Sequence, residues 1–272
     1  MSGPLIHRIR WSGRSDRGRY RQNNEDSFLG LRFNGSELLR LGRYGEQDNS
    51  ATDFAFAVSD GMGGALAGEF ASRIAVEKIT SLLPRAFQQS AAGIQVGFQD
   101  VLTELFHQVH KSLVFLGKSY EECRGMETTL SLCWFTPGWM YFGHVGDSRI
   151  YYWSARERRL RQVTQDDTHV GWLLRHGKIT EWEARSHPGK HVLQKALGGG
   201  NLYVDPQVGA VGYEAGDRFL LCTDGLTEGL YGASLEDEVL REFRDDLADR
   251  IVDTSVQRSG RDNTTALLIE VS

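Results

Sequence analysis

Acidic residues stand next to short apolar runs at five places in this chain. They are Glu25-Asp26, Asp60, Asp147, Asp224 and Asp262. Runs such as DFAFAVSD and RFLLCTD indicate buried strands that end at the acid, and glycine or a short polar residue adjoins it. Carboxylates that converge at strand ends repel one another unless a cation neutralises them. Because hard oxygen ligands favour Mg²⁺ or Mn²⁺ over zinc, the pattern predicts a divalent metal site.

A simpler explanation exists for each acid alone, because Asp and Gly are common turn residues. Five coincidences with strand ends favour one metal site over five unrelated turns. Arg21 lies five positions before Asp26, and its planar guanidinium suits a phosphate held beside a metal pair. A lone arginine is more often an exposed surface charge, so Arg21 supports a phosphate site only together with the acids.

Composition argues against several other classes of protein. A formal net charge of -5, without a strong Lys/Arg cluster, argues against nucleic-acid binding. Three widely spaced cysteines without a CxxC argue against a disulfide framework or a zinc site. No signal peptide is indicated, and no stretch approaches the roughly 20 apolar residues that cross a bilayer. We therefore expect a cytoplasmic protein that binds neither nucleic acid nor membrane.

Short alternating runs and longer helical stripes indicate how these acids are positioned. Strands are expected over residues 6–11, 27–31, 53–59, 128–135, 139–145, 150–153, 160–163, 208–211, 219–223 and 265–271. Helices are expected from residue 71 to an end at Pro84, and over residues 98–113, 235–243 and 247–256. A loop is expected over residues 32–53, and a mostly polar helical segment with a break near Gly177 over residues 167–186. Hairpins with helices in blocks indicate antiparallel sheets covered by helices.

A set of short motifs occurs in one order from Ser15 to the C-terminus. They are Ser15-Asp16-Arg17-Gly18 with residues 21–26, Asp60-Gly61-Met62-Gly63-Gly64, METTL at 126–130, GHVGDSR at 143–149, Ser186-His187-Pro188, LCTDGL at 221–226 and GRDNT at 260–264. Each motif is weak, but the ordered set is highly specific. By these motifs the chain resembles the metal-dependent protein phosphatases of type 2C, in the compact form common in bacteria.

The resemblance implies an α+β fold, a four-layer α-β-β-α sandwich of two mainly antiparallel sheets flanked by helices. It implies one catalytic domain over residues 1–272, with a small helical flap at about 167–190 beside the active site. It also implies two Mn²⁺ or Mg²⁺ ions and a possible third. The implied metal ligands are Glu25, Asp60, the Gly61 carbonyl, Asp147, Asp224 and Asp262, with Asp60 bridging and Asp147 and Asp224 near the third ion.

Two further residues have catalytic roles by the same resemblance. Arg21 is the expected phosphate clamp, and Asp26 is the expected acceptor that orients the attacking water. The implied reaction is hydrolysis of phosphoserine and phosphothreonine by a metal-activated water, without a covalent phosphoenzyme. The expected partners are phosphorylated proteins and a cognate serine/threonine kinase.

Two positions depart from patterns seen in the family. Glu127 stands where many members have glycine, and Met62 stands where some members have a histidine that follows Asp-Gly. Glu127 leaves open a second hypothesis, a catalytically inactive relative that binds phosphoproteins. A third hypothesis is a phosphatase for small phosphorylated molecules with the same metal chemistry.

Overall fold

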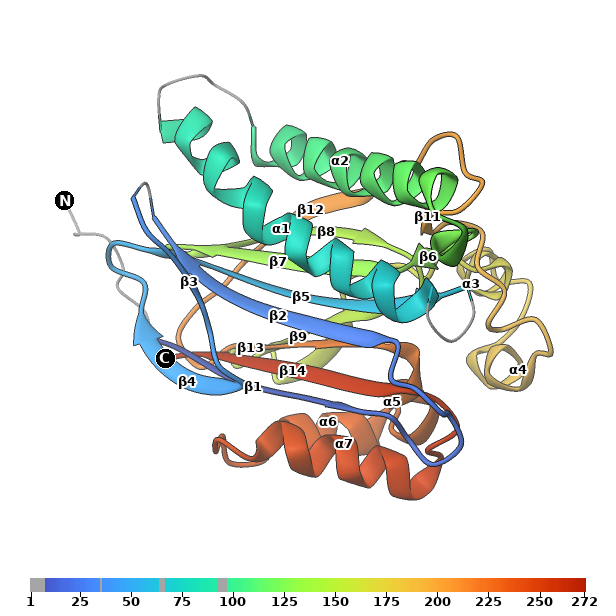
Figure 1. Ribbon diagram of the computed structural model, residues 1–272. Coiled ribbons are helices and arrows are strands. Elements are labelled where there is room, and N and C mark those ends of the chain that lie inside the picture. The colour runs from blue at the N-terminus through green and yellow to red at the C-terminus, as the bar shows by residue number, and fades with distance from the viewer. Residues whose placement is uncertain (1–7, 35, 64–66, 92–96) are drawn as a thin grey trace.

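Two antiparallel sheets pack face to face, with helices on both outer faces (Figure 1). The structure is a computed structural model that describes residues 8–34, 36–63, 67–91 and 97–272, with the backbone alone for 84–91. This is the predicted four-layer α-β-β-α arrangement. It leaves the ends of many strands together at one edge, where side chains from distant parts of the sequence meet.

The first sheet has six strands, with the two chain-terminal ones adjacent at its centre. In spatial order they are β10 (Arg159–Gln162), β9 (Arg149–Ser154), β13 (Arg218–Cys222), β14 (Thr264–Val271), β1 (Arg8–Asp16) and β4 (Tyr44–Asp48). The β1–β14 pairing runs from Ile9 opposite Val271 to Asp16 opposite Thr264. It therefore places the residues that precede β14 beside those that follow β1.

The second sheet has eight strands built around β5. Its main path is β11 (Leu197–Gly198), β6 (Glu127–Thr128), β5 (Asp53–Met62), β7 (Leu130–Thr136), β8 (Trp139–Val145) and β12 (Gln207–Gly212). Off this path, β2 (Asp26–Phe33) pairs with β5 and with β3 (Leu38–Arg40). The predicted β7–β8 hairpin is confirmed, with Thr136 opposite Trp139.

Strand β5 shows why these runs fold as buried strands. Phe54, Phe56 and Val58 lie in the core between the sheets, whereas Ala55 and Ala57 face the helices. Successive side chains of a strand point to opposite faces, so a strand covered on both faces is apolar throughout. Full burial of a side chain such as Phe56 contributes about 1.5–3 kcal/mol.

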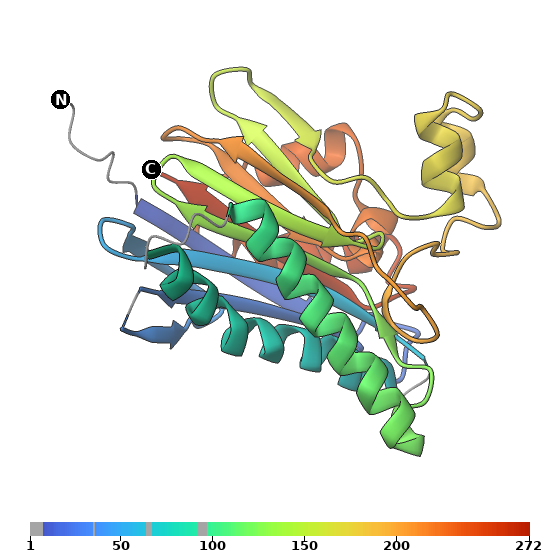
Figure 2. The same cartoon turned by 90° about the horizontal axis from the view of Figure 1, so that it is seen from above.

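Two long helices cover the outer face of the eight-stranded sheet. They are α1 (Ala67–Ala91) and α2 (Phe98–Ser119), which lie side by side in Figure 2. On α2, Leu102, Leu105, Phe106, Val109 and Leu113 are buried at helical spacing. None of the helices in the described ranges is long and apolar enough to span a membrane.

Three shorter helices cover the six-stranded sheet, and two more project from the edge. The covering helices are α5 (Asp224–Gly229), α6 (Ala233–Val239) and α7 (Leu247–Arg258). The projecting pair is α3 (His169–Arg175) and α4 (Glu181–Ser186), and a short 3₁₀ helix, η1 (Glu121–Cys123), follows α2 (Figure 2). The predicted break is confirmed, because Gly177 lies between α3 and α4 with a φ of 62°.

Two predictions about elements are wrong. Residues 32–53 contain the strands β3 and β4, whose side chains are mostly exposed and so carry no apolar alternation. Helix α1 does not end at Pro84 but continues to Ala91. Proline removes one backbone hydrogen bond, yet its fixed φ near −65° is helical, so a long packed helix can include it.

Candidate active site

The predicted acids gather at one edge of the sandwich although they are far apart in sequence. Asp26 opens β2 and lies directly opposite Asp60 of β5. Asp147 follows β8, Asp224 is the first residue of α5 directly after β13, and Asp262 lies just before β14. The antiparallel registers thus bring carboxylates from both sheets to the same edge.

Threonine hydroxyls fix Asp26 between the two sheets. Thr223 Oγ1 and Thr265 Oγ1 donate to Asp26 Oδ2 at 2.8 and 2.7 Å. These hydroxyls come from the end of β13 and the start of β14, so they tie one sheet to the other. Asp26 Oδ1 is buried and has no hydrogen-bond partner among the described residues.

The backbone of Asp60 is held from the neighbouring chain segment at residues 128–129. Its N–H donates to Thr129 Oγ1 at 2.9 Å, and its carbonyl accepts from Thr128 Oγ1 at 2.8 Å. Gly61 follows, and a Cβ built there would lie 1.9 Å from the Gly68 carbonyl oxygen. Only glycine fits at position 61, because the start of α1 packs directly on this backbone.

The carboxylates raise one another's pKa values. Burial, then Asp224 and Asp262, raise the pKa of Asp26 to about 7 against the hydroxyl bonds. Burial together with Asp26, Asp224, Asp147 and Asp262 raises the pKa of Asp60 well above its usual range. Burial followed by Asp224 raises that of Asp147 in the same way. Mutual repulsion of this kind is relieved by a cation.

Arg21 and Glu25 lie at the rim of this cluster. Arg21 Nη2 donates to Asp262 Oδ2 at 2.6 Å, and half of the arginine side chain is exposed. Burial raises the pKa of Glu25, and the Arg21 charge opposes that rise. The Glu25 N–H donates to Asn263 Oδ1 at 2.8 Å, which fixes the segment that carries both residues.

The donor set fits hard divalent cations. Buried oxygens of Asp26 and Asp224 lack hydrogen-bond partners among the described residues, and the neighbouring acids repel one another. In those same ranges no three acidic, histidine or cysteine side chains are arranged to hold one ion between them. Asp224 Oδ2 contacts His191 Nδ1, and Asp262 Oδ2 accepts from Arg21 Nη2.

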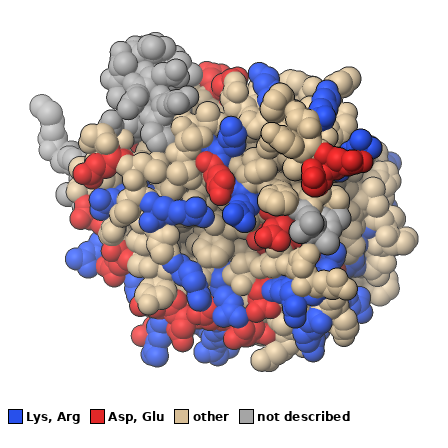
Figure 3. All heavy atoms as spheres, in the orientation of Figure 1, with Lys and Arg blue, Asp and Glu red and all other residues tan. Residues whose placement is uncertain are grey.

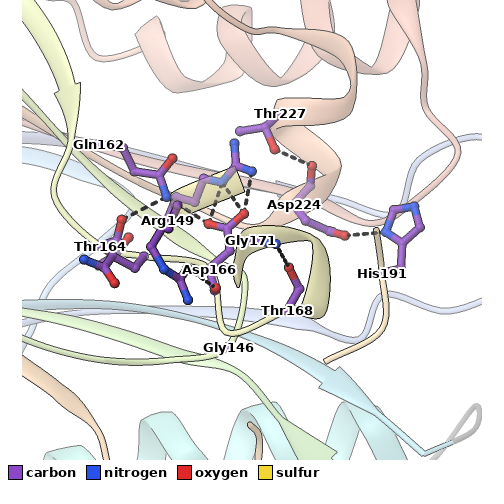
Figure 4. Close-up of polar contacts among 12 residues, drawn as sticks. Gly146, Arg149, Gln162, Thr164, Asp166, Thr168, Gly171, His191, Asp224 and Thr227 are labelled. Carbon is purple, nitrogen blue, oxygen red and sulfur yellow. Dashed lines mark hydrogen bonds and ion pairs between the residues drawn. The ribbon is translucent and has the colours of Figure 1, made fainter. Parts of the chain in front are cut away.

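Sequence analysis missed His191 and Glu228. His191 Nδ1 lies 3.1 Å from Asp224 Oδ2, and its Nε2 lies 3.2 Å from Glu228 Oε1. The hydrogen bonds to Asp224 and Glu228 raise the pKa of His191 to about 10. Figure 4 shows His191 approaching Asp224 from a separate chain segment. No spacing signal connects residues this far apart, so only the fold could reveal the contact.

A second polar group supports the base of the α3–α4 segment. Arg149 Nε donates to Asp166 Oδ1 at 3.0 Å, and Arg149 Nη2 donates to Asp166 Oδ2 at 2.6 Å (Figure 4). Thr168 caps α3 by accepting from the Gly171 N–H at 2.9 Å. Arg185 of α4 stacks over the Tyr231 ring, 3.0 Å from its centroid. The segment is thus fastened at its base and at α4.

A cavity of about 920 Å³ lies between the α3–α4 segment, the acidic edge and α5 to α7. Its lining includes Asp147, Asp224, Arg258 and Arg261. It is large enough to admit a segment of a macromolecule next to the acids.

Met62 and Glu127 lie opposite each other in the β5–β6 pair. Burial raises the pKa of Glu127, which has no hydrogen bond or ion pair to a described residue. A Cβ at Gly199 would lie 1.8 Å from Glu127 Oε1, so this carboxylate rests on the glycine turn after β11. Glu127 is therefore accommodated without displacing the strand that holds Asp60.

Comparison with known proteins identifies the family. The family model described as protein phosphatase 2C matches residues 43–262. This chain belongs to the protein phosphatase 2C family. It is 35% identical over 261 residues to the serine/threonine phosphatase stp of Listeria monocytogenes, and the match covers 94% of each protein.

Solved structures of protein phosphatases have the same fold. The S. agalactiae serine/threonine phosphatase has a TM-score of 0.80 at 28% identity, over 97% of this chain and 100% of that one. The catalytic domain of the phosphatase PstP, solved with two manganese ions, has a TM-score of 0.76 at 27% identity, over 97% and 99%. The predicted family and the predicted α+β sandwich are confirmed.

Proposed function

We propose that this phosphatase hydrolyses phosphoserine and phosphothreonine on proteins at the acidic edge described above. The observation that carries this proposal is the group of buried aspartates that raise one another's pKa values. Its activity class, a metal-dependent serine/threonine protein phosphatase that uses Mn²⁺ or Mg²⁺, is confirmed by the family model, the named relatives and the manganese-bound neighbour.

The ligands that we assign to the ions are those of the acidic edge. They are Asp60, the Gly61 carbonyl, Glu25, Asp224 and Asp262, with Asp147 and Asp224 available for a third ion. The unpartnered oxygens of Asp26 and Asp224 and the mutual repulsion of the acids support this assignment. When bound, two divalent ions neutralise phosphoryl charge and lower the pKa of water enough for attack near neutral pH.

The chain's own residues bind and orient the reactants. Arg21 lies beside Asp262 with a half-exposed guanidinium that can donate two parallel hydrogen bonds to a phosphate. Asp26 Oδ2 is occupied by two threonine hydroxyls, which leaves Oδ1 to accept a proton from the attacking water. A carboxylate with one oxygen held in this way and the other free is suited to accept a proton from water.

The neighbouring segments complete this proposal. Residues 167–190 act as a flap over the cavity within one catalytic domain that spans residues 1–272. Phosphorylated proteins are the substrates, and a cognate serine/threonine kinase in the same cytoplasm is the counterpart of the enzyme.

Hydrolysis of a phosphothreonine peptide and of para-nitrophenyl phosphate tests the proposal. Each substrate is assayed with Mn²⁺, with Mg²⁺ and with excess chelator, using wild type, Asp60→Ala, Asp224→Ala and the remote control Glu214→Gln. We expect metal-dependent turnover of the peptide that both aspartate variants abolish and the control retains.

Two other outcomes would redirect the proposal. Turnover of the small ester alone would indicate a phosphatase for small molecules. No turnover with any metal, in a protein whose circular dichroism shows an intact fold, would overturn the enzymatic function and favour phosphoprotein binding.

A further inference from the structure

Five arginines lie on two chain segments that meet beside Asp262 at the acidic edge. They are Arg17, Arg19, Arg21, Arg258 and Arg261, which we call the arginine rim, and all are exposed. The whole chain has a net charge of -5, and Figure 3 shows basic and acidic residues interspersed over one face of the molecule. A local concentration of positive charge is therefore a distinct feature of this rim.

Backbone contacts hold the two segments together. The Arg19 N–H donates to the Gly260 carbonyl at 2.8 Å, and Asn263 Nδ2 donates to the Arg17 carbonyl at 2.8 Å. Gly18 has a φ of 76°, and a Cβ there would lie 2.4 Å from the Asp262 carbonyl oxygen. This close packing fixes where the arginine side chains start.

The cations of the rim are mostly without acidic partners. Arg21 pairs with Asp262, whereas Arg17 and Arg19 donate to main-chain carbonyls. Arg258 and Arg261 have no hydrogen bond or ion pair to any residue that the structure describes. Arg258 lies in the last turn of α7, where a cation is favourable, but neither guanidinium is paired with a described acid, so both are available to a ligand.

The position of these two arginines relates them to the phosphate. Arg261 directly precedes Asp262, the partner of Arg21, and Arg258 ends α7 four residues before Asp262. Four residues of chain span at most about 14 Å. Both arginines also line the cavity that reaches Asp147 and Asp224. This short span is compatible with a substrate segment that reaches both Arg21 and these two arginines.

We propose that Arg258 and Arg261 bind a second anionic side chain of the substrate, a carboxylate or a phosphoryl group, close to the scissile phosphate. The preferred substrate is then a phosphoprotein segment with acidic or further phosphorylated residues around the target residue. This inference rests on the proposed function, and it assigns to the two arginines a role in specificity rather than in the chemical step. Guanidinium groups suit both anions, because each offers paired oxygens to a planar fork.

Three phosphothreonine peptides of equal length test the rim. One has neutral residues around the phosphothreonine, one has glutamates at the second to fourth positions on both sides, and one has a second phosphothreonine three positions away. The measured quantity is kcat/KM for each anionic peptide divided by kcat/KM for the neutral peptide. It is determined for wild type, the double variant Arg258→Gln/Arg261→Gln and the matched control Arg156→Gln. Arg156 is exposed and lies in the turn at the opposite end of β9 from the site.

We expect wild type to favour the anionic peptides by about three- to tenfold at low salt, mainly through KM. The preference should fall towards one in the double variant and remain in Arg156→Gln. It should also shrink as NaCl rises, because the Debye length is only about 10 Å at 0.1 M. A gain with either anion supports the inference, and the larger gain identifies the preferred one.

A kcat/KM ratio of one in wild type would overturn the role of the rim. So would a higher ratio that the double variant retains. Hydrolysis of para-nitrophenyl phosphate in the same preparations separates this result from failure of the proposed function. If the small ester is turned over and the peptides show no preference, only the rim proposal is wrong. If nothing is turned over in wild type with either metal, the proposed function fails as well.

Discussion

Strand β5 has an aspartate near each end, and the two have different surroundings. Asp53 opens the strand and accepts a hydrogen bond from Trp134 Nε1 at 2.9 Å. Burial raises its pKa to about 6. Asp60 lies near the other end, where four further aspartates add their repulsion to the effect of burial.

The comparison separates two causes of a raised pKa. Burial alone disfavours the charged form of any carboxyl, so the pKa of Asp53 identifies an apolar environment and nothing more. Repulsion among several carboxylates identifies a place that gains free energy when a cation binds. We therefore expect Asp60 and Asp53 to respond differently to metal and to substitution by asparagine.

Asp60→Asn should have the largest effect on activity. Loss of the central carboxylate should reduce kcat/KM for a phosphothreonine peptide by on the order of 10³-fold. It should also remove the increase in Tm that Mn²⁺ gives to wild type, because metal that binds only the folded state stabilises it. The matched change on the same strand, Asp53→Asn, should retain both properties. A variant at Asp60 that keeps the Mn²⁺-dependent Tm increase would show that the acidic edge is not the metal site.

Asp53→Asn should instead change the pH dependence of stability. The folded pKa of Asp53, about 6, lies above its ordinary value of 3.8. The stability associated with a protonated Asp53 is thus fully present below pH 3.8 and is lost as the pH rises through 6. The asparagine carries no charge and still accepts the Trp134 hydrogen bond.

Urea unfolding at two pH values measures this effect. Asp53→Asn should be more stable than wild type by roughly 2–3 kcal/mol at pH 8 and about equal at pH 4. Equal differences at both pH values would show that Asp53 does not lose a proton in this range in the folded protein. Addition of Mn²⁺ should leave the difference between the two proteins unchanged.

Sequence patterns predicted β5 as a buried strand that ends at Asp60, because a continuous apolar run and an Asp-Gly pair are local signals. The approach of Asp26 to Asp60 depends on the β2–β5 register, and the Asp26 hydroxyl bonds depend on two strands of the other sheet. Neither is encoded in a short segment. The strands β3 and β4 escaped prediction because they are held by backbone pairing with mostly exposed side chains.

The arginine rim is a second feature that the sequence could not predict, in this case a distribution of charge. No single segment has a strong basic cluster, so the composition indicated no basic patch. The excess of positive charge arises only where residues 17–21 pack on residues 258–261. Such convergence is a property of the fold, and sequence spacing does not reveal it.

Glu228 adds a third case to the comparison of Asp60 with Asp53, because it is an acid near the edge that is paired with cationic side chains. It accepts from Lys190 Nζ at 2.9 Å and lies 3.2 Å from His191 Nε2, and these contacts hold its pKa down at about 2. Glu228→Gln should loosen residues 190–191 while leaving the metal ligands in place. KM for a phosphopeptide should change by about three- to tenfold, with kcat/KM for para-nitrophenyl phosphate within about twofold of wild type.

The exposed Glu214 provides the matched control, since Glu214→Gln should change neither constant. A large loss of small-ester hydrolysis in Glu228→Gln would show that Glu228 supports the metal ligands directly. In that case the contact between His191 and Asp224 would belong to the catalytic arrangement rather than to the flap.

Glu127 is the smallest test of the comparison, because it lies close to Asp60 in the sheet yet resembles Asp53 in its surroundings. Burial alone raises its pKa, and no carboxylate of the edge contributes to that rise. If repulsion marks the metal site, Glu127→Gln should alter activity by less than about threefold and leave the Mn²⁺-dependent Tm increase intact. It should stabilise the protein slightly at pH 8, by about 0.5 kcal/mol, since the side chain is only half-buried. Loss of the Mn²⁺-dependent Tm increase in Glu127→Gln would instead place this carboxylate among the groups that bind the ions. A pKa raised by burial without repulsion would then no longer distinguish an acid outside the metal site from a metal ligand.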